Sequence, residues 1–445
     1  MQWKRTRVRN KKEEICHEKT DVTAAGAAPG FGGGGGTAFA EEGTDIRNLI
    51  GDGENTISIA FDGQSFNEEA LFGVLEDFYN ETGISVEVIY VASTGGWGGF
   101  FSKIQTMIAG GDAPDVIRIA IEGFELFLDN GIIVPLNEYE EKYPEFAALV
   151  SDNHEKLTEP FTVDGQIYGY GFDWNNVVTH INLNLVEEAG LEMPDVEWTT
   201  EEFLEYAKAM TMTREDGTQT YGVYVPTSYF QLNAWLYNWG AAILSDDMTE
   251  SVINSPEAVE MFQFLHDLIY VEGVAPIPDS ATGGEGEFMS NQIGMIFGGR
   301  WLLNGYNTNG FYDVDVAYIS TEAANQVISG VGIFPVAAAS DKKDEAYKLS
   351  AWLCSADAQG RIMENGAIPT STSCMETVRE AEFPANSYIF ADSADIARSV
   401  QCPAEYADLQ EILDRYVGLI YADEMDVQSA LDACKEEMDL VLMGF

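Results

Sequence analysis

Short apolar runs alternate with amphipathic stretches near the start of this sequence, and this alternation restricts the fold more than any other feature. Residues 57–61 and 84–91 are short and apolar, as strands are, and residues 68–79 between them have the apolar spacing of a helix. A strand, a helix and a second strand in this order predict parallel neighbours in a sheet, with the helix packed on one face.

A second helix and a third strand continue the alternation. Apolar residues recur at helical spacing in residues 101–108, and Gly110 with Gly111 can end that helix. Residues 116–121 are apolar nearly throughout and too few for a buried helix, which favours a strand covered on both faces. Glu122 would then follow the carboxyl end of a parallel strand, where open α/β sheets bind their ligands.

The length and the charge of the chain restrict it further. A chain of 445 residues is too long for one ordinary hydrophobic core, so we expect two lobes. The formal net charge of -51, from 74 acidic and 23 basic residues, would repel phosphate backbones and argues against nucleic-acid binding. A heavily solvated surface is the simplest explanation of this acidity.

The residue types that carry catalysis or metal binding form no recognisable pattern. The five cysteines include no C-x-x-C pair and no zinc spacing, and the four histidines are scattered. The sequence shows no nucleophile elbow, no HExxH motif and no P-loop. Residues 30–35 fit a nucleotide-binding glycine pattern only formally, because no strand precedes them and no amphipathic helix follows. We therefore expect no catalytic residue, no metal and no cofactor.

Residues 1–55 are predicted to lie outside the fold. Residues 1–19 are basic and polar, residues 24–40 are rich in Ala and Gly, and no apolar segment of a secretion signal is visible. The codons of residues 10–20 can hide a ribosome-binding site and a start in another frame. The segment is therefore expected to be a disordered or a mis-translated leader.

The remainder of the sequence predicts a second lobe that is rich in helices. Thr199 and Glu202 have the spacing of a capping box, so a helix is expected from there to about Met210. Residues 173–176 interrupt two strand-like pieces and indicate a passage between lobes. Further helices are expected at residues 234–239, 256–270, 288–297, 342–355, 406–421 and 427–442, and further strands at residues 313–319 and 330–340.

Several stretches of this chain together carry a recognisable pattern. They are FYNETGISVEVIYV followed by FFSKIQTMIAGGDAPDV, EPFTVDGQIYGYGFDWNNVV, INLNLVEEAGLEMPDVEWTTEEFLEYAKAM, FMSNQIGMIFGGRW and KKDEAYKLSAWLCSADAQGRIMENGAIPT. In this order they resemble the family 1 extracellular solute-binding proteins, the sugar receptors of ABC importers that include maltose-binding protein. The resemblance covers the chain from about residue 57 to its end.

The resemblance implies a two-lobed α/β fold, with a mainly parallel sheet flanked by helices in each lobe and a ligand cleft between the lobes that closes by a hinge. Residues 56–172 with 322–375 would form lobe 1, and residues 173–321 with 376–445 would form lobe 2 with the closing helices. The chain should cross between the lobes near residues 172–176, 319–321 and 375–382.

Two departures from the family pattern are evident. Where the family usually has Tyr-Asn-Lys, this chain has Ile181, Asn182 and Leu183, which changes a local contact. The expected lipoprotein signal is not visible, so the expected location, lipid-anchored on the outer face of the cell membrane, depends on the resemblance.

Two groups of predicted ligand contacts follow strands of lobe 1. Glu122 matches an acidic contact of the family, and a carboxylate there can accept hydrogen bonds from sugar hydroxyls. Asp62 and Gln64 follow the first strand, and the family uses this loop for hydroxyl contacts. A solvated loop for Glu122 and a helix-entry turn for Asp62 and Gln64 are the structural alternatives.

The aromatic contacts are predicted mainly between the lobes and in lobe 2. Trp301 matches a position that stacks on sugar rings in the family, with core packing as the alternative. Burying an indole face against a sugar gives roughly 2.5 kcal/mol, more than one hydrogen bond of about 1 kcal/mol. Trp174 and Asn175 match an interlobe contact, with hinge packing as the alternative. Further candidates for the ligand site are Trp97, Tyr229, Trp235, Trp239 and Tyr406.

These residues predict an extracellular receptor, not an enzyme, that binds an oligosaccharide between its lobes. Its expected partners are the transmembrane subunits of an ABC importer, and the receptor itself is expected to be a monomer. A glycoside hydrolase that uses Asp62 with Glu122 or Asp173 is the alternative from another class. A receptor of the same fold for a cationic polyamine is the alternative ligand class, because the chain is so acidic.

Overall fold

The computed structural model describes residues 45–62, 68–91, 96–278, 284–322, 326–363 and 366–444. Contacts between residues place these described residues in one compact unit. Two predictions fall outside the described residues: the leader up to residue 44, and the ligand contact at Gln64. Among the described helices, none is both long and apolar enough to cross a membrane.

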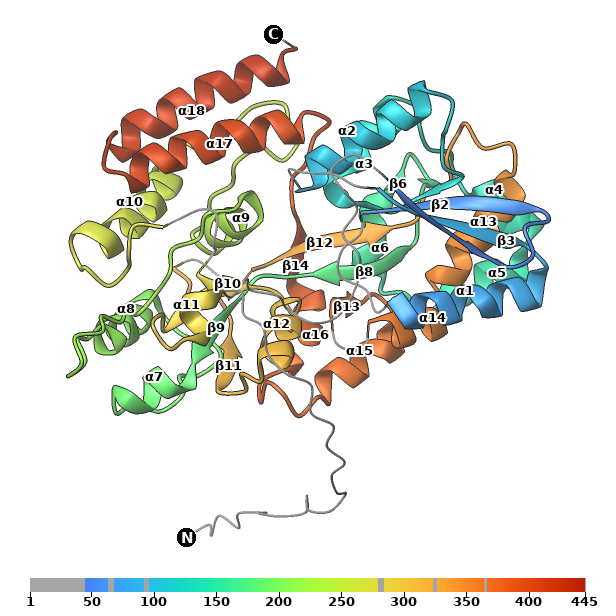
Figure 1. The fold of residues 1–445 in the computed structure, drawn as a ribbon. Helices are drawn as coiled ribbons and strands as arrows, with labels where there is room; N and C mark the ends of the chain where they lie inside the picture. Colours follow the sequence, from blue (N-terminus) through green and yellow to red (C-terminus); the bar gives the residue numbers. More distant parts are fainter. Residues whose placement is uncertain are drawn as a thin grey trace, which may run out of the picture. The chain divides into compact units, whose positions relative to one another are not determined.

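The first sheet contains the predicted parallel strands. Its order is β1-β3-β2-β4, and β2 (Thr56–Phe61) runs parallel to both β3 (Ser85–Tyr90) and β4 (Val116–Ile117). Helix α1 (Glu68–Thr82) joins β2 to β3, and α2 (Gly96–Ala109) joins β3 to β4, as the alternation predicts. In Figure 1 this sheet, in blue, lies on the right-hand side with α1 and α13 around it.

Strand β1 (Ile46–Ile50) was expected to be part of the leader, and this expectation is wrong. The strand pairs antiparallel with β3 at the edge of the first sheet. Its Arg47 Nη1 also forms an ion pair with Glu87 Oε2 on β3, at 2.9 Å. An edge strand needs backbone hydrogen bonds on one side only, so a short, half-polar segment can form it without an apolar pattern.

The third predicted strand is divided. Strands β4 and β5 (Ile119–Ala120) are separated by Arg118, and β5 pairs antiparallel with β12 instead of continuing in the first sheet. Helix α3 (Ile121–Asp129) begins directly after β5. Glu122 therefore lies in the first turn of a helix and not in a loop after a parallel strand, which corrects the expectation.

The second sheet is antiparallel, whereas a mainly parallel one was expected. Strand β9 (Val178–Asn182) lies between β10 (Met295–Gly298) and β11 (Val314–Ala317), and both neighbours run antiparallel to it. The helix predicted over residues 288–297 is wrong for most of its length, because α11 ends at Met289 and residues 295–297 belong to β10. Every residue of β10 is buried, and a short apolar run of this kind does not distinguish a strand from a helix.

A central sheet lies between these two sheets (Figure 1). Its order is β13-β8-β12-β14, with β5 also paired to β12. Strand β8 (Gly171–Asn175) contains most of the segment expected to interrupt the strands, and the chain passes from it directly into β9 of the second sheet. The other strands are β12 (Val327–Ile333), β13 (Ile368–Pro369) and β14 (Ala397–Ser399).

Apart from residues 288–297, the helices predicted in the second half are confirmed, although α9 begins at Tyr229 and not at residue 234. In α8 (Thr200–Met210) the capping box is complete, because Glu202 N donates to Thr199 Oγ1 at 3.2 Å and Thr199 N donates to Glu202 Oε2 at 2.8 Å. The other helices of this group are α9 (Tyr229–Asn238), α10 (Pro256–Tyr270), α17 (Tyr406–Tyr421) and α18 (Val427–Leu442).

The remaining elements connect and cover the sheets. Helix α13 (Lys343–Leu353) buries the predicted face of Ala346, Leu349 and Leu353. The others are α4 (Asn137–Lys142), α5 (Pro144–Ala147), α6 (Glu155–Thr158), β6 (Thr162–Val163), β7 (Gln166–Ile167), α7 (Leu183–Glu188), α11 (Glu285–Met289), α12 (Leu302–Asn309), α14 (Ala356–Ile362), α15 (Thr372–Arg379) and α16 (Tyr388–Asp392).

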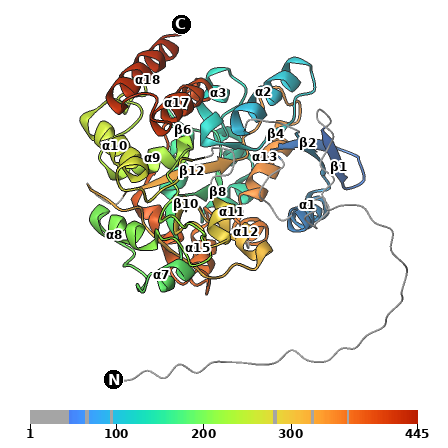
Figure 2. The same cartoon turned by 60° about the vertical axis from the view of Figure 1, so that its left-hand side comes forward.

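Two halves of the molecule, one around the first sheet and one around the second, meet at helices α2 and α17 on one side of the central sheet. The two helices lie close to each other in both views (Figures 1 and 2). A Cβ atom on Gly98 of α2 would lie 3.3 Å from the Cβ atom of Ala407 on α17. This contact places the beginning of α17 beside the first turn of α2, which follows β3.

Candidate ligand-binding site

The strand pair β8–β12 forms one face on which residues from both halves meet. Gly330 of β12 stands opposite Asn175 of β8. A Cβ atom on Gly330 would lie 3.1 Å from the Phe230 ring and 4.0 Å from Glu122 Oε1. Directly opposite residues of two strands point to the same face. Asn175 therefore lies on the same face as Glu122 and Phe230. We call this surface the Asn175 face, or ligand face.

Two acceptor oxygens on this face have no hydrogen-bond partner among the described residues. They are Glu122 Oε2 and Asn175 Oδ1, and both atoms are shielded from solvent. A buried polar atom without a partner costs about 1–3 kcal/mol, and most such atoms in folded proteins are satisfied by protein, water or ligand. The pair can therefore accept hydrogen bonds from the hydroxyl groups of a bound molecule.

The carboxyl group of Glu122 can be either neutral or charged near neutral pH. Burial raises the pKa of Glu122 to about 7, and the positive charge of Arg118 only partly opposes this rise. Arg118 Nη2 forms an ion pair with Asp173 Oδ1 at 2.7 Å, and both side chains are buried. The nearest cation is thus engaged with another acid, so Glu122 can act as acceptor or, when protonated, as donor.

Aromatic rings border this face. The ring centroids of Phe230 and Trp301 are 6.4 Å apart, and Trp301 is half-buried. Tyr406, in the first turn of α17, packs on Tyr229 with a centroid separation of 5.2 Å. Burial raises the pKa of Tyr406, and the negative charge of Glu122 adds to that rise, so the two side chains are close.

Two further predicted residues stand at the edge of the first sheet. Trp97 of α2 is half-buried and stacks on Phe101, and the Arg118 guanidinium lies 5.4 Å from its ring centroid. Asp62 follows β2 directly and is half-buried.

Two of the predicted contacts lie in the core instead. Trp174 has no exposed surface and stands next to Asn175 in the strand, so its side chain points to the opposite face. Tyr229 is 1% exposed, and its hydroxyl donates to the Gln401 carbonyl at 2.9 Å. A molecule on the Asn175 face would meet neither side chain unless the strand or α9 moved.

The sequence analysis missed Phe230 and Gly330, which both shape the face. Phe230 adjoins the predicted Tyr229, and the helical phase of α9 decides which of the two rings points to the ligand face. Gly330 provides room that any side chain would fill. The sequence signal for Gly330 is the pair of glycines at positions 330 and 332. Assigning this segment to a strand does not show why glycine is needed there.

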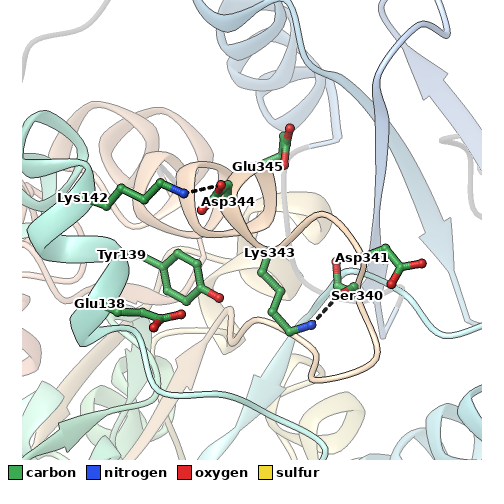
Figure 3. Close-up of a pocket in the computed structure, with 8 residues that line it drawn as sticks. All are labelled: Glu138, Tyr139, Lys142, Ser340, Asp341, Lys343, Asp344 and Glu345. Atoms are coloured by element: carbon green, nitrogen blue, oxygen red, sulfur yellow. Dashed lines mark hydrogen bonds and ion pairs between the residues drawn. The ribbon is translucent and has the colours of Figure 1, made fainter.

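Two surface hollows lie away from this face. The first, of about 480 Å³, lies between α4 and the start of α13 and is polar (Figure 3). Lys142 Nζ pairs there with Asp344 Oδ2 at 2.5 Å, and Lys343 donates to the Ser340 carbonyl. The second, of about 590 Å³, lies along α10 beside Trp239 and Gln428. The first hollow contains no predicted ligand contact. The second contains the predicted Trp239, whereas the predicted Trp235 has no exposed surface and lies in the core.

Comparison with known proteins identifies the family to which this chain is similar. The model of a family described as bacterial extracellular solute-binding protein matches residues 73–391. The maltotriose-binding protein of Pyrococcus abyssi is 21% identical over 294 residues, which are 64% of this chain and 60% of that protein. The arabinooligosaccharide-binding protein of Halalkalibacterium halodurans is 25% identical over 171 residues, which are 38% of this chain and 36% of that protein.

A solved structure shows the same fold over nearly its whole length. It is an ABC substrate-binding protein from Listeria monocytogenes in complex with cycloalternan. It matches with a TM-score of 0.78 at 25% identity, covering 88% of this chain and 99% of that one. The likeness confirms the predicted two-lobed α/β fold. The residue boundaries of the two lobes stay a prediction.

Proposed function

The chain belongs to the bacterial extracellular solute-binding proteins, and from this membership we propose that it is the receptor of an ABC importer for an oligosaccharide. The ligand would lie on the Asn175 face, between the first and second sheets. Asn175 and Glu122 would accept hydroxyl hydrogen bonds, and Trp301 with Phe230 would cover an apolar sugar face. Asp62, Trp97 and Tyr406 would complete the site.

The pair of open acceptors on Glu122 and Asn175 carries this proposal. They come from α3 and β8, so one molecule that satisfies both would bridge an element of the first half and a strand that leads into the second. Ligands that contact both lobes stabilise the closed form of a hinged protein, because only such ligands bind the two forms with different affinity. The relatives described above, whose names include maltotriose and arabinooligosaccharides, support a sugar as the ligand class.

We further propose that the protein binds its ligand without cleaving it. A glycoside hydrolase needs two carboxyl groups that act on one glycosidic bond. Asp173, one candidate partner for Glu122, is already engaged in the buried ion pair with Arg118. Product analysis after incubation with oligosaccharides should show no cleavage, and turnover would contradict this part of the proposal.

A ligand screen by thermal unfolding tests the proposal. Neutral oligosaccharides should raise the melting temperature, since a ligand at a hundred times its Kd adds about 2.7 kcal/mol of stability. Polyamines such as spermidine should give no shift. A shift with spermidine that disappears at high salt, together with no shift from sugars, would contradict the sugar proposal and favour a cationic ligand.

Matched variants test where the sugar binds. Asn175→Ala should weaken binding of the sugar found in the screen by about tenfold or more, since one hydrogen bond left unmade on either partner costs 1–3 kcal/mol. Asp344→Asn, in the hollow of Figure 3, should leave the affinity unchanged. Calorimetric titration measures both affinities. If Asp344→Asn weakened sugar binding and Asn175→Ala did not, the sugar would bind in that hollow instead.

The family description implies an extracellular or periplasmic location for the protein. We propose that it is anchored to the outer face of the membrane by a lipid, that it acts as a monomer, and that it delivers ligand to the transmembrane subunits of an importer. Radiolabelled fatty acid should be incorporated into the protein in its native host. Fully unlabelled protein, recovered free in the medium, would contradict the anchor.

A further inference from the structure

Arg300 connects two parts of the molecule that are far apart in sequence. It follows β10 of the second sheet and is only 6% exposed. Its Nη1 donates to the carbonyl oxygens of Gly366 at 2.8 Å and Ala367 at 3.2 Å, and it lies 3.4 Å from that of Met363. These carbonyls belong to the backbone that leads from α14 into β13 of the central sheet.

The contacts of Arg300 with these carbonyls all come from one nitrogen of the guanidinium. Nη1 carries two N–H donors, which can bond the Gly366 and Ala367 carbonyls. Burial lowers the pKa of Arg300 to about 10, which still leaves the group charged at neutral pH. A buried, charged donor of this kind fixes the two backbones that it joins.

The neighbouring residue makes this connection important for the ligand site. Trp301 folds back over Gly299, where an added Cβ atom would overlap its indole ring. The same Cβ atom would lie 2.5 Å from the carbonyl oxygen of Asn176, which adjoins Asn175. The indole thus rests on the backbone of a turn whose own place depends on Arg300.

We propose that Arg300 is a positioning residue for ligand binding. It ties the turn of residues 299–301 to Gly366 and Ala367, and this tie holds the Trp301 indole beside Phe230 on the Asn175 face. The proposal rests on the proposed function for the role of Trp301 in binding. The tie itself and its effect on the indole do not depend on any ligand.

Fluorine NMR of protein labelled with 5-fluorotryptophan tests the effect on the indole without a ligand. Trp301→Phe identifies the Trp301 resonance. Arg300→Met should shift or broaden that resonance, and Arg300→Lys should restore part of its position. The resonance of Trp352, whose Nε1 donates to the Val74 carbonyl at 3.2 Å in the first half, should stay unchanged as a control for folding. An unchanged Trp301 resonance in a folded Arg300→Met protein would overturn the proposal.

A double-mutant cycle with maltotriose tests the effect on binding. Arg300→Met should weaken binding by about tenfold to a hundredfold, the effect of losing a hydrogen bond to a charged group, and by less than about threefold in a Trp301→Ala background. An equal loss in both backgrounds would show that Arg300 acts only through general stability. If Arg300→Met does not fold, Arg300→Lys carries both tests. If maltotriose does not bind wild-type protein, the cycle uses the oligosaccharide found in the screen. If no oligosaccharide binds, the sugar proposal fails, while the resonance still decides the role of Arg300.

Discussion

At the residue scale, Glu122 combines a cost to stability with its proposed role in binding. Its carboxyl group is shielded from water, and its Oε2 has no partner in the described part of the chain. Burial therefore favours the neutral form. A protein that kept this residue for stability alone would do better with an uncharged side chain, which is consistent with a role in binding.

The stability of a Glu122→Gln variant should reveal this cost. In the unfolded chain the carboxyl loses its proton near pH 4.5, and in the folded protein near pH 7. Between these values the folded state binds more protons, so this residue makes the wild type less stable as pH rises. The variant should match the wild type near pH 4 and exceed it by about 3 kcal/mol above pH 7. Urea unfolding at several pH values measures the difference, and a constant offset would contradict the account.

Gly330 and Phe230 show why the site was only partly predictable from sequence. Glu122 and Asn175 were predicted because their residue types and flanking motifs resemble a known family. Phe230 was missed because α9 is buried on nearly all sides. The sequence of such a helix does not show which of two adjacent rings, Tyr229 or Phe230, points into the core. Gly330 was missed because its function is the absence of a side chain, which matters only once β8 is paired with β12.

At the element scale, the junction of β8, β12 and the β4–β5 turn holds the base of the site. The buried pair Arg118–Asp173 joins β8 to the turn before β5, and Gly332 of β12 lies against both groups. A Cβ atom on Gly332 would overlap Asp173 Oδ1 and Arg118 Nη1. The strand can therefore carry only glycine there while the ion pair stays in place.

A Gly332→Ala variant should break this junction. The added methyl group has to displace one partner of a buried ion pair, and breaking such a pair costs about 3–5 kcal/mol. Gly418→Ala is the matched control, because its added methyl group meets nothing within 4 Å on the exposed side of α17. That change should raise the free energy of unfolding by about 0.5–1 kcal/mol. Denaturant unfolding of both variants decides, and a neutral Gly332→Ala would contradict the packing described.

The helices were easier to predict than the strands, for a physical reason. Helix α10 and α18 agree with their predicted bounds because an amphipathic period repeated over four turns is a local property of the sequence. Strand β10 was mistaken for helix, and β1 for leader, because their stability comes from partners distant in the chain. The antiparallel direction of the second sheet likewise follows from pairings that no single segment encodes.

At the scale of the whole molecule, the three sheets explain how binding and closure can be coupled. The central sheet joins the first and second sheets, and the ligand face lies on it with groups from both sides: Glu122 from the first half, and Phe230 with Trp301 from the second. A ligand held by both groups would favour the arrangement in which they are close. The contact between α2 and α17 closes the same side.

Hydrogen–deuterium exchange with and without a saturating neutral oligosaccharide tests the central claim most directly, because it locates the ligand on the chain. We predict that the ligand slows exchange in the first turn of α3 at Glu122, at the end of β8 at Asn175, in the turn before α12 at Trp301 and at the start of α17 at Tyr406. Exchange in α4 and along α10, at the two surface hollows, should not change. Protection confined to either hollow, with unchanged exchange around Glu122 and Asn175, would contradict the claim that the sugar binds between the two halves.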